Sequence, residues 1–492
     1  MLRSFFWASV AVLLASTPAY AQGRGREDLT EKVEADRLRA DPLISLEGKH
    51  FPNLEEAKTR FGPARRTFYA AADAPAGGDG SETKPWKDVP KALCRLRPGD
   101  RLVLQPGVYS GRFVIAEGCA DGSAGAPIQV FGQEAFLHGG SEKTPLITVA
   151  RAHWQLWDLE LVLGEAASTG VLVTGPGAHD VLLDDLHVYE GPGSAIRIEG
   201  GSSKVVVANG HIHQTSGIVV AGAARDVTIT RNKIHHNSGS AVTVRGTDRA
   251  LVENVTISLN KLHNDKGRAL DLSGVRGVRA SMNKIYNYRP AGGFPGEAIR
   301  VGRDARDVVI EGSFVAEATV GVRVGESGQP PPMNVVIRRN YFENRLTRES
   351  VTVDIVAGRD VGVFNNTIDR YAVAFRGPAT GGERLTIANN LVLEPSLVAL
   401  RFPRAEALAY LDHNAFSRAD GKVQAQVGAT TADLEAHRAA GRMTHSRVEK
   451  RVELVDRDLA KLTPAAAFAD TGMAFGAVAF KGRAPDIGVA EK

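Results

Sequence analysis

The sequence predicts an all-β protein whose body is a single-stranded right-handed parallel β-helix, a solenoid of short strands stacked rung upon rung. Three observations lead to this fold class. A unit of 23 to 28 residues recurs through the middle of the chain, each unit holds three short segments rich in Val and Ile, and Gly or Ser turns interrupt it. Such a period with three strands per unit is typical of a solenoid, whose repeats contact only their neighbours.

The first 21 residues have the pattern of a signal peptide. Arg3 supplies positive charge, residues 5–15 form an almost unbroken apolar run, and Ala19-Tyr20-Ala21 matches the site that signal peptidase reads. The apolar run is too short to span a bilayer comfortably, which takes about 20 residues. We therefore expect removal of residues 1–21, an exported protein in the periplasm or outside the cell, and no membrane span.

Composition and charge exclude several other classes. The chain of 492 residues has 52 Gly and only 6% aromatic residues, which suits many tight turns and thin layers. Its net charge of +4 does not by itself indicate a polyanion partner. No phosphate loop, nucleophile elbow or zinc motif occurs. We expect a monomer with no nucleic-acid partner.

The chain before the repeat divides into two parts. Residues 22–65, with the charged stretch EDLTEKVEADRLRA, are expected to form a helical or linker segment. From Arg66 we expect a strand, a Gly-rich loop and a short helix over Trp86–Leu93 before the first rung. A cap of this kind protects the open end of the stack from edge pairing.

The chain contains two cysteines, Cys94 and Cys119. They are 25 residues apart, close to the repeat period, so they could face each other on adjacent rungs. In an exported protein such a pair predicts a disulfide.

An Asn recurs once in each unit after the first strand. It is found at Asn209, Asn232, Asn260, Asn283, Asn340, Asn366, Asn390 and Asn414. Asn tolerates the left-handed backbone of a tight turn, and its amide can bond to the same Asn one rung away. These residues are therefore expected to be structural. The leucine-rich repeat has a similar period, but its L-x-x-L-x-L-x-x-N pattern is absent.

The repeat ends near Phe416, so the β-helix is predicted over residues 66–416 and a C-terminal cap and tail over 417–492. The segment TTADLEAHRAAGR is expected to contain a helix, with LTPAAAFADTG and APDIG closing the chain.

Alternation along the strand after each turn predicts one outward-facing strip. Aliphatic pairs such as Ile299 and Val301 face inward, so the residue between them faces out. The strip is Arg197, Thr243, Asp271, Arg300, Arg323, Asp354 and Ala374, with Glu199, Arg245, Ser273 and Arg376 one step along and His213, His236, Lys266, Arg268, Tyr288 and Glu297 on the adjoining turns. Such an Arg-rich strip suits an acidic polymer, because Arg binds carboxylates or sulfates through paired hydrogen bonds. The alternative is that these charges merely pair with one another as surface salt bridges.

Several stretches carry a family resemblance. RPGDRLVLQPGVYSGRFVIAEG with GAPIQVFG is similar to the opening rungs of bacterial polysaccharide lyases, and NKIYNYRPAGGFPGEAIRVG resembles a rung of the lyase family that contains chondroitinase B and alginate lyases. The resemblance implies that this protein is a polysaccharide lyase, which cleaves an acidic, uronate-containing polysaccharide by β-elimination. The family's catalytic Lys and Arg follow on later rungs, and the next rung here, VGVRVGES, has no Lys.

A later pair of rungs, ESVTVDIVAGRD and YAVAFRG, fits the family pattern better. By this resemblance Arg376 stands at the position of the catalytic Arg and Arg359 near that of the Lys. Glu349 and Asp354 would take the place of the acids that bind Ca²⁺. Arg in place of Lys is a departure from the family.

Uronate cleavage by β-elimination needs a base for the proton α to the carboxylate, a cation that stabilises the resulting negative charge, and an acid for the leaving oxygen. Residues suited to these roles form two predicted clusters. The first is His236, Lys266, Arg268, Asp271 and Arg300, and the second is Glu349, Asp354, Arg359 and Arg376. Arg197, Arg245, Asp271, Arg323 and Tyr288 are predicted to bind substrate.

Three other functions remain open. A hydrolase would need two carboxylates about 5 to 9 Å apart, for which Asp271 and Glu297 are candidates, and a uronate C5-epimerase could use the same scaffold. The protein could also bind or handle a glycan without turnover. His213, His235 and His263 share one position after the Asn and are expected to stack as a ladder and not to bind a metal.

Overall fold

The computed structural model describes residues 62–139, 143–166, 169–291, 293–345, 349–449, 472–473 and 487–488. The chain divides into two units, Met1–Gly48 and Lys49–Lys492, and all described residues belong to the second. The predictions for residues 1–21, most of 22–65 and most of the tail therefore lie outside the described residues. Among the residues that are described, no helix is long and apolar enough to cross a membrane.

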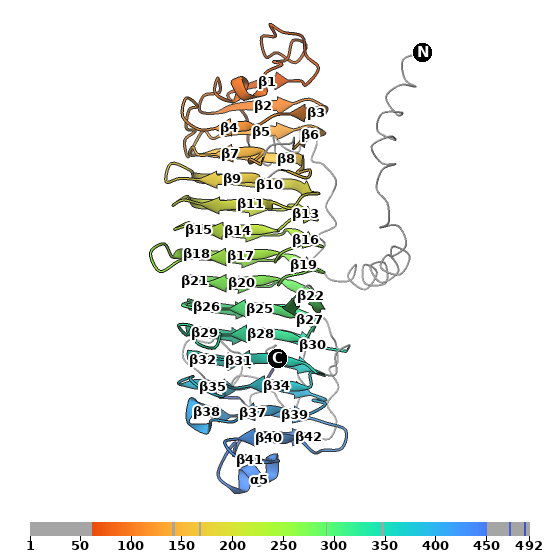
Figure 1. The fold of residues 1–492 in the computed structure, drawn as a ribbon, viewed down its shortest axis with the longest axis vertical. Helices are drawn as coiled ribbons and strands as arrows, with labels where there is room; N and C mark the ends of the chain where they lie inside the picture. The colour runs from red at the N-terminus through yellow and green to blue at the C-terminus, as the bar shows by residue number, and fades with distance from the viewer. Residues whose placement is uncertain are drawn as a thin grey trace, which may run out of the picture. The chain divides into compact units, whose positions relative to one another are not determined.

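The second unit is a right-handed parallel β-helix, as predicted, with three faces (Figure 1). The first face stacks β1 (Arg66–Ala70), β2 (Asp100–Leu104), β5 (Ile128–Gly132), β12 (Ser203–Ala208), β15 (Arg225–Thr230), β18 (Val252–Ser258), β21 (Val275–Ser281), β26 (Arg306–Glu311), β29 (Met333–Arg338), β32 (Arg359–Phe364), β35 (Leu385–Ala388) and β38 (Leu408–Asp412). Two long strands, β8 (Trp154–Val162) and β10 (His179–Tyr189), run through both the first and the second face.

The second face stacks β3 (Gly107–Ser110), β6 (Ala135–His138), β13 (His211–His213), β16 (Lys233–His235), β19 (Lys261–His263), β22 (Lys284–Tyr288), β27 (Phe314–Ala318), β30 (Tyr341–Glu343), β33 (Thr367–Asp369), β36 (Leu391–Leu393), β39 (Ala415–Ser417) and β42 (Arg447–Glu449). A small hairpin of β23 (Pro290–Ala291) and β24 (Phe294–Pro295) follows β22.

The third face is a separate sheet of β4 (Phe113–Ile115), β7 (Ile147–Val149), β9 (Thr169–Thr174), β11 (Ser194–Glu199), β14 (Ile218–Ala221), β17 (Val242–Arg245), β20 (Leu270–Ser273), β25 (Glu297–Val301), β28 (Val320–Val324), β31 (Val351–Ile355), β34 (Val373–Arg376), β37 (Leu400–Phe402), β40 (Gln424–Val427) and β41 (Thr430–Asp433). The last strand, β41, pairs antiparallel with β40 and ends the sheet.

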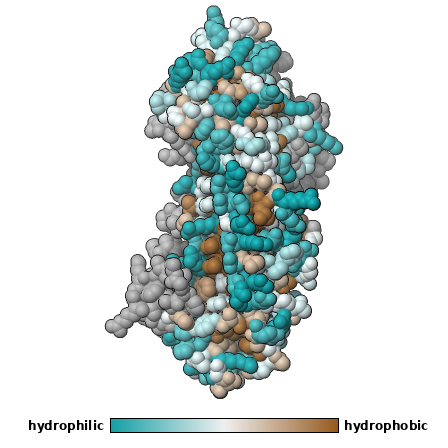
Figure 2. Space-filling model, turned by 90° about the vertical axis from the view of Figure 1, so that its left-hand side faces the viewer, coloured by the Kyte–Doolittle hydropathy of each residue, from teal (hydrophilic) through white to brown (hydrophobic). Residues whose placement is uncertain are grey.

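The core is a continuous column of aliphatic side chains between the faces. On the third face Ile299 pairs with Val322 and Val322 pairs with Val353, and all three are buried. Each buried aliphatic side chain of this size contributes about 1.5–3 kcal/mol. The outside is correspondingly polar. Figure 2 shows one side of the molecule covered mostly by hydrophilic residues, with small hydrophobic patches between them.

The predicted Asn ladder forms between the first and second faces, but its first position is Gly210 and not Asn209. Its members are Gly210, Asn232, Asn260, Asn283, Ser313, Asn340, Asn366, Asn390, Asn414 and Ser446. In each link a backbone N–H donates to the side-chain oxygen one rung further along. Because Lys233 pairs with His211, Asn232 lies opposite Gly210, so the assignment of Asn209 to the ladder was wrong.

The left-handed backbone also lies one residue earlier than expected. The residues before the ladder positions, from Asn209 to His413, have φ between 51° and 59°. Asn209 itself instead donates from its amide to Asp184 at 2.6 Å. The ladder Asn is therefore selected for its buried amide and not for a left-handed conformation.

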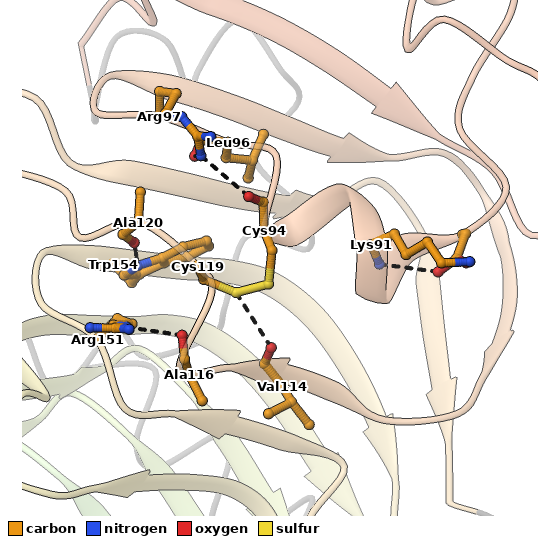
Figure 3. Close-up of a disulfide and its surroundings, with 11 residues drawn as sticks. Lys91, Cys94, Leu96, Arg97, Val114, Ala116, Cys119, Ala120, Arg151 and Trp154 are labelled. Carbon is orange, nitrogen blue, oxygen red and sulfur yellow. Dashed lines mark hydrogen bonds and ion pairs between the residues drawn. A yellow bond between two sulfur atoms is a disulfide. The ribbon is translucent and has the colours of Figure 1, made fainter.

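The N-terminal cap contains the predicted helix, shortened to α4 (Val89–Leu93). Asp88 caps it by accepting a hydrogen bond from the N–H of Lys91, which satisfies a free donor of the first turn. The predicted disulfide between Cys94 and Cys119 is present and joins the end of α4 to the turn after β4 (Figure 3). It therefore fastens the cap to the first rung of the third face.

At the other end the coil continues past Phe416. β40 pairs in parallel with β37, and β42 pairs in parallel with β39. A 3₁₀ turn, η1 (Ala405–Ala407), precedes β38, and the predicted helix in the last turn is α5 (Leu434–Ala439), capped by Asp433. The described tail residue Ile487 is buried against Leu391 and Leu393 of the second face.

Candidate functional site

The predicted strip lies on the third face as one outward column, confirmed by the register of the strands. Its successive members are Arg197, Val219, Thr243, Asp271, Arg300, Arg323, Asp354, Arg376, Arg401 and Gln426. Ala374 was predicted to belong to it, but Ala374 is buried, and Asp354 pairs with Arg376. The error arose because alternation gives the direction of a side chain but not its register against the next rung.

Arg300 and Asp271 form the first centre of an ion-pair network on this column. Two nitrogens of the Arg300 guanidinium contact Asp271 Oδ1 at 2.9 and 2.7 Å, and a third contacts Glu326 at 2.8 Å. The Asp271 side chain is only 6% exposed. Arg245 adds a contact to Asp271 at 3.5 Å. This pairing of a buried carboxylate with planar guanidinium groups offsets the cost of burying its charge.

Glu297 extends the network to the later rungs. Its side chain is 2% exposed and contacts Arg268 Nε at 2.5 Å and Arg323 Nε at 2.9 Å. Arg323 also contacts Asp354 at 3.0 Å, and Arg376 binds both oxygens of Asp354 at 2.7 and 2.6 Å. The network thus joins Arg268, Asp271 and Arg300 of the first predicted cluster to Asp354 and Arg376 of the second. We call the connected set the arginine network; its members are Arg245, Arg268, Asp271, Glu297, Arg300, Arg323, Glu326, Asp354 and Arg376.

The arginine network presents guanidinium groups outward over buried acids. Asp271, Glu297 and Asp354 are almost fully buried, whereas the side chains of Arg323, Arg376 and Arg245 are 27%, 35% and 58% exposed. Each guanidinium carries five N–H donors in a planar fork, so the exposed edges can still donate to a ligand. The acids are covered, so the part of the network that faces solvent consists of guanidinium groups held in place from below.

The burial of Asp271 and Glu297 also argues against their predicted role as the catalytic pair of a hydrolase. Asp271 and Glu297 both contact Arg268, at 3.7 and 2.5 Å. A glycosidase needs one carboxyl group to donate a proton and one to act as base or nucleophile on the sugar. Carboxylates that are covered and bonded to Arg are poorly placed for these roles.

Arg359 lies away from Arg376, contrary to the predicted second cluster. It begins β32 on the first face and pairs with Glu383 at 2.9 Å. Both line a surface cavity of about 240 Å³, together with Glu326 and the turn at Gly381 and Gly382. The resemblance placed Arg359 by its distance along the chain, but the chain bends between β31 and β32 and carries it to another face.

His236 and Lys266 lie on the turns that lead from the second face to the third. Both side chains are exposed. His236 Nδ1 lies 2.6 Å from His235 Nδ1, and the backbone N–H of Lys266 donates to Asn237 at 2.9 Å. Neither forms an ion pair with the arginine network, all of whose members the structure describes. They stay candidates for proton transfer at the edge of the third face.

Arg197 lies on the same column, three rungs before Asp271, and pairs with Glu199 at 2.6 Å. It therefore stands apart from the network.

Tyr288 cannot contact a polymer, so its predicted substrate role was wrong. Its side chain is fully buried, and its hydroxyl donates to Asp265 Oδ2 at 2.6 Å. Asp265 Oδ1 also accepts from the backbone and side chain of Asn237. The position of Tyr288 beside a turn suggested exposure, but the β23–β24 insertion follows it and the ring packs into the core.

Burial raises the pKa of Asp265 to about 7, in spite of its bonds to Tyr288 and Asn237. The unfolded chain loses this proton near pH 4. The folded state therefore binds more protons between about pH 4 and pH 7, and its free energy of unfolding falls as the pH rises through this range. We expect Asp265→Asn to remove roughly 4 kcal/mol of this pH dependence. Urea unfolding of both proteins at pH 4 and pH 8 checks it, and parallel pH profiles would contradict it.

Ca²⁺ at Glu349 and Asp354 is implied by the family resemblance. Ca²⁺ takes six to eight oxygen ligands. Here both oxygens of Asp354 are bonded to Arg376, and Arg323 lies 3.0 Å from one of them. Glu349 is exposed at the start of the rung. These residues do not fit a Ca²⁺ site as they stand.

The predicted stacking of His213, His235 and His263 is confirmed on the second face. His213 stacks on His235 with ring centroids 5.3 Å apart, and His235 stacks on His263 at 4.8 Å. Tyr189 and Tyr286 continue the stack at either end. Burial lowers the pKa of His213 to about 4, and burial together with neighbouring His residues lowers the pKa of His235 further. These rings are therefore neutral at pH 7.

Two parts of the surface were missed by the sequence analysis. Glu326 completes the arginine network, and His187 and His211 form a second His column beside the ladder. The alternation in His211-Ile212-His213 was the available signal, because it places both imidazoles on one side of the strand.

Known proteins resemble this chain in fold. Residues 169–294 and 216–392 match the family described as the right-handed β-helix region. No curated protein sequence matches the chain. Among solved structures it is similar to pectate lyase Pel9A, with 16% identity, a TM-score of 0.46, and coverage of 88% of this chain and 98% of that one.

Two further solved structures show similar coverage. The alginate lyase from Paenibacillus sp. str. FPU-7 has 17% identity and a TM-score of 0.41 over 65% of this chain and 98% of that one. PfbA, a surface adhesin of Streptococcus pneumoniae, has 13% identity and a TM-score of 0.42 over 74% and 94%. At these identities the likeness concerns the β-helix fold alone.

Proposed function

We propose that this right-handed parallel β-helix protein binds an acidic, uronate-containing polysaccharide along the outward column of its third face and cleaves it by β-elimination. The observation that carries the proposal is the arginine network, in which Arg300 and Arg323 occupy adjacent positions of the column and Arg376 follows after Asp354. Successive outward residues on stacked strands are about 4.8 Å apart, which is close to the length of one sugar unit. Carboxylates along a polymer could therefore meet successive guanidinium groups.

In this proposal the network supplies the cationic charge that elimination requires. A guanidinium of Arg300 or Arg323 would hold the uronate carboxylate and stabilise the negative charge that develops beside it. Lys266 or His236, from the edge of the face, would take the proton α to the carboxylate. The electron pair would form the new carbon–carbon double bond, the glycosidic carbon–oxygen bond would break, and the leaving oxygen would take a proton from the second of these two residues.

A digestion panel tests the proposal. The purified protein is incubated with alginate, pectate, glucuronan and glycosaminoglycans, with and without added Ca²⁺, while ultraviolet absorbance reports the new double bond. We expect a rise with one class of polymer and a loss of about 10- to 100-fold in affinity or turnover for Arg323→Ala, as expected for a charged hydrogen bond. Arg338→Ala is the matched control, because Arg338 has similar exposure and pairs with Glu311 on the first face.

Binding without turnover is the second candidate function, and one observation favours it. The bonds from Arg376 to Asp354 raise the pKa of this guanidinium above its ordinary value, so Arg376 stays charged and can hold an anion but does not take up a proton. Retained binding of a polymer with no absorbance change and no new reducing ends would select this candidate. If none of the acidic polymers binds, both candidates are excluded.

A further inference from the structure

A group of three imidazoles on the second face has no role in the proposed function. His187 of β10 pairs with His211 of β13, and His213 lies two residues further along β13 on the same side of the strand. His187 Nε2 and His213 Nε2 are 3.0 Å apart, and the rings of His187 and His211 are parallel at 4.8 Å. One nitrogen from each of the three residues lies within 4.8 Å of the others. All three side chains are partly exposed, so a solute can reach them.

We propose that His187, His211 and His213 bind a divalent transition-metal cation of the borderline class, represented by Zn²⁺. Zinc lies about 2.0–2.1 Å from a His nitrogen, so two ligand nitrogens of a tetrahedral ion are about 3.3 Å apart. The 3.0 Å between His187 and His213 needs to open by only a few tenths of an ångström. Imidazole nitrogens favour Zn²⁺, Cu²⁺ and Ni²⁺ over Ca²⁺ or Mg²⁺.

Neighbouring side chains offer a carboxylate that can orient a ligand ring and a nitrogen that can serve as a fourth ligand. Glu160 Oε1 lies 3.7 Å from His187 Nδ1 and accepts a hydrogen bond from Tyr189 at 2.5 Å. A carboxylate beside the second nitrogen of a ligating His orients the ring and raises its basicity. His235 Nε2 lies 2.8 Å from His211 Nε2, so a fourth nitrogen is at hand.

Stacking alone does not account for these residues. Tyr189 and Tyr286 complete the ladder with rings that carry no nitrogen. Beside the ladder, the column of His187 and His211 continues with Lys233 and Lys261. Both imidazoles of this second column place a nitrogen close to a ladder nitrogen of the next rung, His187 at 3.0 Å from His213 and His211 at 2.8 Å from His235.

Two other groups of possible ligands occur among the described residues, but their acids are occupied. Asp180 contacts His179 and Lys204. Asp412 accepts hydrogen bonds from the backbone of His413 and His445 and from Ser446 at the end of the Asn ladder. The group on the second face is the one made entirely of imidazoles.

The test is a Zn²⁺ titration of the whole chain, purified without a polyhistidine tag and stripped with EDTA. Isothermal calorimetry measures stoichiometry and affinity, and Co²⁺ replaces Zn²⁺ so that visible absorption reports tetrahedral coordination. We expect one ion per chain at this site. His213→Phe keeps a flat ring in the ladder and should weaken Zn²⁺ binding at least tenfold.

His263→Phe is the matched control, because His263 stacks in the same ladder two rungs away and is fully buried. We expect it to bind Zn²⁺ as the wild type does. Wild-type protein that binds no Zn²⁺, a His213→Phe variant that binds as tightly as wild type, or equal losses in both variants would overturn the proposal. None of these outcomes depends on the polysaccharide.

Discussion

Replacing Asn366 by Ala is expected to lower the free energy of unfolding by about 3–5 kcal/mol. Asn366 lies in the middle of the Asn ladder and is fully buried. Its Oδ1 accepts from the backbone and the side chain of Asn340 at 3.0 Å. Its Nδ2 donates to the carbonyl of Ile337 at 2.9 Å and to Asn390 Oδ1 at 2.9 Å. Alanine would leave the Asn340 N–H buried without this partner, at about 1–3 kcal/mol, and would also remove the bonds to Ile337 and Asn390, at about 1 kcal/mol each.

Urea unfolding followed by circular dichroism measures this loss. The control is Asn254→Gly, because Asn254 is exposed, lies outside the ladder and has a positive φ of 55° that Gly adopts without strain. We expect the control to change the free energy of unfolding by less than about 1 kcal/mol. A loss in Asn366→Ala no larger than in this control would show that the ladder does not hold the rungs together.

The second large effect is expected for Glu297→Ala, also about 3–5 kcal/mol. Glu297 joins Arg268 and Arg323, which approach it at 2.5 and 2.9 Å. Removing it leaves two partly buried guanidinium groups without this partner, and the loss of one member of a buried ion pair costs more than the pair contributes. Arg323 keeps Asp354 and Arg268 keeps Asp271, which limits the loss.

Glu326→Ala is the control for this prediction. Glu326 is 33% exposed, and its partner Arg300 remains bonded to Asp271. Exposed ion pairs contribute about 0–1 kcal/mol, so the control should be nearly neutral. Thermal and urea unfolding at low and high salt compare the two variants. Equal effects in both would mean that the arginine network is a set of ordinary surface pairs.

Particular residues show which features could be predicted from the sequence and which could not. The inward aliphatics of the third face and the stacked His residues follow from alternation and period alone, because both repeat along the chain. Asn209 and Ala374 were misplaced by one or two residues, since neither pattern fixes where a rung begins. Arg359 was placed near the site by its distance along the chain and Tyr288 by its position beside a turn, but a bend carries Arg359 to another face and Tyr288 is buried.

By itself the sequence determined the β-helix, the cysteine pair and the existence of an Arg-rich strip. These features follow from the alternation of residues within a strand, from the length of the repeat, or from a spacing close to that length. All three can be measured along one sequence. Only the tertiary structure decided which charges meet. Glu297 connects Arg268 with Arg323, and His187 meets His213, because strands from different rungs lie side by side in a defined register. A shift of one residue on any rung would turn these side chains to the opposite side of the sheet.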